Sequence, residues 1–132
     1  MLASFRDRGW DASMAPEPVL DLEAIAALQA VGEGDGGAFF RELVDIFLAD
    51  TPQRLAEAET ALAAGDFATA GRAVHSIKGS AGNFGASGLS RLAFQAESEA
   101  KAGRADGMRA VLPALRGEFA RVEAALRELR GP

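Results

Sequence analysis

Apolar residues recur every three or four positions along most of the chain, and this helical period most constrains the fold. In the clearest segment, residues 66–90, the repeat places one set of side chains on a single stripe of a helix at about 100° per residue. They are Phe67, Ala70, Val74, Ile77, Ala81 and Phe84. Tyrosine is absent and alanine and leucine dominate, which favours helix throughout. No segment carries a strong strand signal.

Glycines and capping residues divide the pattern into five expected helices. These run from the cap Asp21 to Gly32, from about Ala38 to Ala64, from the cap Asp66 to near Gly85, from the cap Ser87 to Gly103, and from about Asp106 to Arg130. Pro52 is expected to kink or split the second helix, and Pro113 to bend the last helix or mark its start. Short connections make neighbours antiparallel. The predicted fold is therefore all-α: an antiparallel up-down four-helix bundle with a short extra N-terminal helix.

Length and composition predict a single domain. Of the 132 residues, 19–132 are expected to form the bundle and 1–18 a flexible N-terminal arm, whose Phe5 and Trp10 could dock on the bundle or on a partner. The net charge of -5 argues against nucleic-acid binding, and the apolar runs are too short to span a membrane. Cysteine is absent, which excludes disulfides and suits a cytoplasmic protein.

His75 is the only histidine, and it lies off the apolar stripe of its helix. Positions three, four and seven residues away share its side of the helix. They are Gly71, Arg72, Lys78, Gly79 and Gly82. A glycine inside a helix costs about 1 kcal/mol relative to alanine, so this cluster needs a reason. Missing side chains would let another protein approach the ring.

The residue types around His75 suit a phosphoryl acceptor. Imidazole is a nucleophile when neutral. Lys78 and Arg72 would favour the neutral ring and could pair with phosphoryl oxygens, to which Asn83 could also donate hydrogen bonds. No acid occurs between Asp66 and Glu97, so no carboxylate of this segment would repel a phosphoryl dianion.

Plainer interpretations remain open for these residues. Lys78 could lie along the edge of the apolar stripe, and Gly79 and Gly82 could serve close helix packing. The acids, Glu97 among them, are interpreted as solvated faces opposite the apolar positions. No metal-ligand spacing, nucleotide-binding loop or acid near His75 is evident, so we expect no metal site and no phosphorylation from ATP.

The run H-S-I-K-G-S-A at 75–81, followed by F-G at 84–85, resembles the signature of histidine-containing phosphotransfer (HPt) domains of multistep two-component phosphorelays. The resemblance extends from about Val19 to Leu129 and includes A-L-A-A-G-D before the histidine helix. In that family the histidine takes a phosphoryl group from an aspartyl-phosphate on a receiver domain and passes it to another receiver. In the same family, the residues three and four positions after the histidine support the phosphoryl group. Phe84 departs from the commonest pattern, in which a smaller aliphatic residue is frequent.

The resemblance implies a phosphocarrier that is not itself an enzyme, phosphorylated on His75. The residues expected to support the phosphoryl group are Lys78, Gly79, Arg72, Gly82 and Asn83. The implied partners are receiver domains of response regulators or hybrid histidine kinases, which in this family supply the aspartate and Mg²⁺. The chain itself is expected to need no cofactor and to act as a monomer. The alternative is a helical binding module that docks a receiver or kinase without carrying phosphate.

Overall fold

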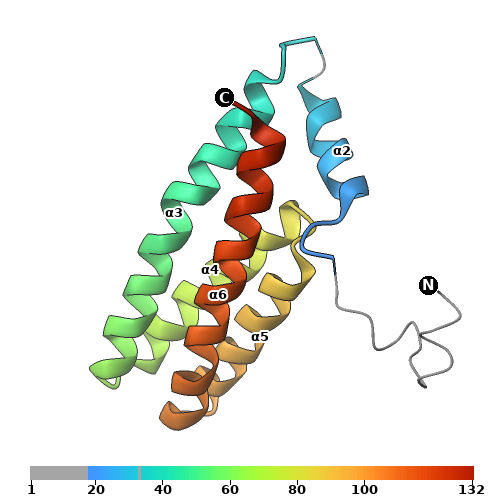
Figure 1. The fold of residues 1–132 in the computed structure, drawn as a ribbon. Helices are drawn as coiled ribbons and strands as arrows, with labels where there is room; N and C mark the ends of the chain where they lie inside the picture. Colours follow the sequence, from blue (N-terminus) through green and yellow to red (C-terminus); the bar gives the residue numbers. More distant parts are fainter. Residues whose placement is uncertain (1–17, 33) are drawn as a thin grey trace, which may run out of the picture.

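The computed structural model describes residues 18–32 and 34–132, and the regular structure of this part of the chain is entirely helical (Figure 1). The helices are α2 (Leu22–Val31), α3 (Ala38–Ala63), α4 (Phe67–Asn83), α5 (Ser87–Lys101) and α6 (Ala105–Arg130). The all-α prediction is confirmed. The expected arm at 1–18, with Phe5 and Trp10, lies outside the described residues apart from Pro18.

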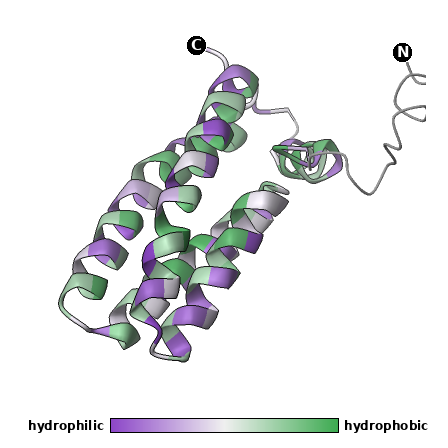
Figure 2. Ribbon diagram, turned by 60° about the horizontal axis from the view of Figure 1, so that its bottom comes forward, coloured by the Kyte–Doolittle hydropathy of each residue, from purple (hydrophilic) through white to green (hydrophobic). Residues whose placement is uncertain are grey.

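The four longer helices form the bundle. α3 and α5 each contact both α4 and α6, so α4 and α6 occupy opposite corners. α2 is the short extra helix at one end, where it contacts α3 (Figure 1). Each helix carries apolar and polar residues around its circumference (Figure 2), as expected when one face is buried and the other meets solvent.

The stripe predicted on the histidine helix lies in the core. Val74, Ile77 and Ala81 are buried, and Phe84 is only 4% exposed. The centroid of the Phe84 ring lies 4.9 Å from that of Phe47, within the range of favourable aromatic pairs. The large side chain at position 84 is therefore accommodated inside the bundle.

Two of the three predicted helix caps are confirmed. The backbone N–H of Glu23 donates to Asp21 Oδ1 at 2.9 Å, and that of Thr69 donates to Asp66 Oδ1 at 3.1 Å. The prediction for Ser87 is wrong, because Ala86 is the capping residue of α5 and has no side-chain cap. Ala86 is fully buried. Packing in the core therefore explains why a small apolar residue, and not a capping residue, stands at this position.

Neither proline interrupts its helix. Pro52 lies inside α3, and Pro113 lies inside α6, which begins at Ala105. The alternatives of a split at Pro52 and a start at Pro113 are therefore wrong. Each proline removes one backbone hydrogen bond. The fully buried neighbours Leu55 and Leu115 supply packing that offsets this loss.

Gly85 joins α2 to the connection between α4 and α5. Its φ is +63°, a left-handed conformation that favours glycine. A Cβ at this position would collide with the side chain of Asp21, whose backbone N–H donates to the Gly85 carbonyl at 2.9 Å. The start of α2 can approach this closely only because residue 85 has no side chain.

Candidate functional site

The imidazole of His75 stands on the solvent side of α4. Its neighbour Val74 is fully buried in the core, whereas the His75 side chain is 63% exposed. Successive residues of a helix point about 100° apart, so the burial of the apolar stripe turns His75 outward. The accessible ring expected from the sequence is present.

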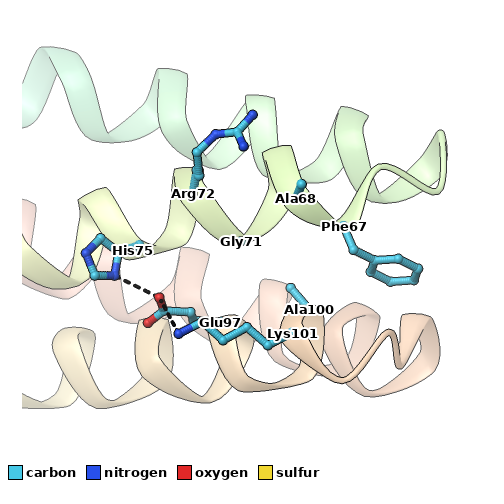
Figure 3. A pocket seen from close by; sticks show the side chains of 8 residues that line it. All are labelled: Phe67, Ala68, Gly71, Arg72, His75, Glu97, Ala100 and Lys101. Carbon is cyan, nitrogen blue, oxygen red and sulfur yellow. Dashed lines mark hydrogen bonds and ion pairs between the residues drawn. The ribbon is translucent and has the colours of Figure 1, made fainter.

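A carboxylate from the neighbouring helix holds this ring. Glu97 of α5 places Oε2 2.7 Å from His75 Nδ1, although the Glu97 side chain is only 6% exposed. Lys78 Nζ donates to Oε1 of the same carboxylate at 2.9 Å. Lys101 Nζ lies 3.4 Å from Oε2, and Figure 3 shows His75 and Lys101 converging on Glu97. Both carboxylate oxygens are thus engaged.

Glu97 remains ionised at neutral pH. Burial raises the pKa of its carboxyl, but the hydrogen bonds from Lys78 and His75, together with the charge of Lys78, bring the pKa below its ordinary value of 4.5. The two lysines offset the charge that burial would otherwise leave uncompensated.

The bound carboxylate decides which nitrogen of His75 is available. An ionised carboxylate only accepts hydrogen bonds, so Nδ1 must carry the proton that joins it to Glu97. In the neutral ring the lone pair then resides on Nε2. Figure 3 shows this second nitrogen pointing away from Glu97. The arrangement therefore presents Nε2 to solvent as a nucleophile.

The interpretation of Glu97 as part of a solvated face was wrong, and so was the expectation of no acid near His75. Glu97 follows Ala93 by four residues and precedes Ala100 by three, and both alanines are buried. Glu97 therefore belongs to the inward stripe of α5. A charge on a buried stripe requires a partner. The sequence signal for this contact was the position of Glu97 on the same helix face as these alanines, and the sequence analysis missed it.

The glycines beside His75 fall into two groups. A Cβ on Gly71 would meet the Ala100 side chain at 3.5 Å, so this glycine lies in the contact between α4 and α5. A Cβ on Gly79 or Gly82 would have no neighbour within 4 Å. Helix packing therefore does not account for these two glycines, and their place beside the imidazole favours access by another molecule.

The remaining predicted residues lie at the margin of this cluster. Arg72 lines the same hollow as His75, of about 410 Å³. However, its guanidinium donates to Thr69 Oγ1 at 3.2 Å and points away from Glu97 (Figure 3). Asn83, at the end of α4, lines a different hollow together with Ile46 of α3. The structure thus brings Lys78 to His75 through Glu97, but not Arg72 or Asn83.

The acidic side chains of the described chain do not gather into a metal site. Within residues 18–32 and 34–132, no group of three or more histidine, aspartate or glutamate side chains is placed to hold a metal ion. None of the helices found there combines the length and apolar character needed to cross a membrane.

The lowered pKa of Glu97 predicts a pH-dependent contribution to stability. A carboxyl that is more acidic when folded stabilises the fold above its unfolded pKa, and the contribution is lost as the pH falls through the folded pKa. Replacing Glu97 by Gln should lower the free energy of unfolding at pH 7 by about 1–2 kcal/mol, because glutamine offers one uncharged oxygen in place of two charged ones, so that one of the two donors, Lys78 or His75, loses its acceptor. The deficit should shrink below a pH of about 4.5. Urea unfolding of the wild type and of Glu97→Gln between pH 3 and pH 7 measures this difference in unfolding free energy.

A suitable control is Glu42→Gln, which removes one carboxylate from an exposed position on α3. For each variant, the loss of unfolding free energy relative to the wild type is plotted against pH. An equal loss in Glu97→Gln and Glu42→Gln at every pH would show that the buried contacts of Glu97 add no stability.

Comparison with known proteins identifies the family. The family model described as "Hpt domain" matches residues 42–127. The crystal structure of histidine-containing phosphotransfer protein B from Pseudomonas aeruginosa PAO1 is 31% identical, with a TM-score of 0.79 over 87% of this chain and 96% of that one.

Two plant structures are also similar. Histidine-containing phosphotransfer protein ZmHP2 from maize is 26% identical, with a TM-score of 0.69 over 93% of this chain and 84% of its own. A putative histidine-containing phosphotransfer protein from rice is 23% identical, covers 98% of this chain and 85% of its own, and shares the fold with a TM-score of 0.75. No curated protein sequence gives a match. Because the matched domain spans residues 42–127 and the bundle carries an exposed His75 on α4, the chain belongs to the Hpt domain family.

Proposed function

We propose that this protein is a phosphoryl carrier in a two-component phosphorelay. Nε2 of His75 accepts a phosphoryl group from a phospho-aspartate on a receiver domain and passes it to a second receiver. The observation that carries the proposal is the exposed imidazole whose Nδ1 is held by the buried carboxylate of Glu97 at 2.7 Å. Membership of the Hpt domain family supports the same function.

The geometry supports transfer without proton movement at the ring. The lone pair of Nε2 forms the N–P bond as the P–O bond of the aspartyl-phosphate breaks, and the electron pair of that bond returns to the aspartate carboxylate. Nδ1 keeps its proton, so the phosphorylated ring is an imidazolium whose charge faces Glu97. Transfer to the next receiver reverses these steps and releases neutral imidazole, a good leaving group.

Lys78 and Lys101 have different proposed roles. Lys78 reaches Glu97 Oε1 from the turn of α4 that follows His75, and it can turn from this oxygen to those of the phosphoryl group. Lys101 stays beside Oε2, so the carboxylate keeps a cation when Lys78 leaves. Gly79 and Gly82 leave the space that the receiver needs. Arg72 and Asn83 would act at the edge of the receiver contact.

We further propose that the partners are receiver domains of response regulators or hybrid histidine kinases. The acids of the receiver would hold the Mg²⁺ that assists transfer, and the carrier would bring no cofactor of its own. Lysines around His75 complement an acidic receiver pocket. A relay needs rapid partner exchange, so we expect a modest interface formed by a monomeric carrier in the cytoplasm.

The test is phosphoryl transfer from a panel of receivers that carry a labelled aspartyl-phosphate. We expect at least one receiver to label this protein through a bond that is stable in alkali and lost in acid, and ¹⁵N NMR should place the group on Nε2 of His75. Receivers that bind without transferring label would instead indicate a docking module. That alternative leaves the engaged Nδ1 and open Nε2 of His75 unexplained.

A further inference from the structure

Phe94, which the sequence analysis did not single out, is an aromatic residue beside the candidate site. Of the aromatic residues that the structure describes, it alone is exposed, at 55%. It lies on α5 three residues before Glu97, and positions three apart on a helix are neighbours. Phe94 therefore lies one turn before Glu97 on the same side of α5.

The ring faces the ammonium group of Lys78. Nζ of Lys78 lies 5.3 Å from the centroid of Phe94, within the distance of a cation–π interaction. The same nitrogen donates to Glu97 Oε1 at 2.9 Å. The ammonium of Lys78 thus has two partners on α5, one charged and one aromatic.

A third contact fixes the backbone of Lys78. The Ser90 hydroxyl donates to the Lys78 carbonyl at 3.3 Å. Ser90, Phe94 and Glu97 follow one another at spacings of four and three residues, so they form one row along α5. This row contacts Lys78 from its carbonyl oxygen to its ammonium nitrogen.

We infer that Phe94 is a positioning residue for phosphoryl transfer, because its ring helps to hold the Lys78 ammonium at Glu97, the carboxylate that also binds the imidazole of His75. This inference rests on the proposed function. A free lysine side chain has many accessible rotamers, and much of this freedom must be lost before its charge can serve a phosphoryl group. Contact with the ring removes part of that freedom in advance, and Lys78 is only 29% exposed as a result of its contacts.

The exposure of Phe94 gives it a second, separable role. Phe94, Lys78 and Gly82 line one open hollow, so a receiver entering the space at Gly82 would also cover the ring. Covering the ring excludes water from the Lys78 contact, and a cation–π interaction is stronger when it is desolvated. Any apolar residue could supply the docking contact with the receiver, but only an aromatic one could attract the ammonium.

The test uses whichever phosphorylated receiver labels the wild type fastest. Phe94→Leu keeps an apolar side chain but removes the ring. The transfer rate at saturating receiver should fall roughly fivefold to thirtyfold, because the docked receiver keeps the contact free of water, while the half-saturating receiver concentration should change little. Phe94→Tyr should retain the rate, because tyrosine also attracts cations. In the Lys78→Met background, Phe94→Leu should have no further effect.

Two results would overturn the inference. One is an unchanged rate in Phe94→Leu, and the other is an equal slowing by Phe94→Leu with and without Lys78. Circular dichroism of each variant excludes unfolding as a cause. If the wild type accepts no label, the proposed function itself fails. If it accepts label and the Phe94 variants transfer at the wild-type rate, only this inference fails.

Discussion

Replacing His75 by glutamine is expected to abolish phosphoryl acceptance. The lone pair of an amide nitrogen is delocalised and is not nucleophilic, whereas Nε2 of the imidazole is. The His75 side chain is largely exposed, but it donates to the buried Glu97 carboxylate, so its replacement should lower the free energy of unfolding by about 1 kcal/mol. We therefore expect complete loss of label in a protein that still folds and whose thermal transition falls by only a few degrees. Incubation with a labelled receiver and circular dichroism during heating measure the two properties.

The matched control for this experiment is Ser76→Ala. Ser76 is the next residue, and its hydroxyl, which donates to the Arg72 carbonyl at 3.2 Å, is the nearest alternative acceptor along the chain. This variant should take up label at the wild-type rate. Label that persisted in His75→Gln, or vanished in Ser76→Ala, would show that the imidazole is not the acceptor.

The second large effect is expected from Gly79→Leu. A Cβ at Gly79 would meet no other group within 4 Å, and leucine favours helix over glycine, so the isolated protein should be more stable by about 0.5–1 kcal/mol. The added side chain would occupy the space that a receiver needs. Overpacking a close-packed contact costs about 1–3 kcal/mol, equivalent to roughly 5- to 150-fold weaker docking. Thermal unfolding and transfer at several receiver concentrations measure the two opposite changes.

Gly117→Leu provides the comparison for this variant. Gly117 also lies inside a helix, and a Cβ there would have no neighbour within 4 Å, but it belongs to α6, at the opposite corner of the bundle from α4. It should gain similar stability and retain transfer. Equal transfer by the two leucine variants would mean that no partner docks over Gly79.

Much of the fold followed from local chemistry that the sequence displays. Asp21 and Asp66 cap their helices because a carboxylate can reach backbone N–H groups within the same turn. Ser87 has the same capability but lies one position beyond the cap, because the bundle buries Ala86. The continuity of α3 through Pro52 likewise depends on packing. Contacts between helices determine both the cap position of α5 and the continuity of α3. A local sequence pattern carries no information about such contacts.

The same distinction applies to the site. The accessibility of His75 could be predicted because it depends on α4 alone. Its partner Glu97 could not be found from the 66–90 segment, because the contact joins residues 22 positions apart on two helices. The apolar period of α5 alone could have placed Glu97 between the buried residues Ala93 and Ala100. The choice of His75 as its partner would still have required the relative placement of the two helices.

The junction between α4 and α5 also constrains how this protein can vary in length. Only residues 84–86 separate the two helices. One residue inserted within α5 ahead of Glu97 would change the phasing of that helix by about 100° and swing the carboxylate away from His75. At the far end of α5, Gly103 faces open space, and an insertion there leaves the helical phase between Asn83 and Glu97 untouched. Length changes compatible with an oriented imidazole should therefore accumulate at the Gly103 end of the bundle.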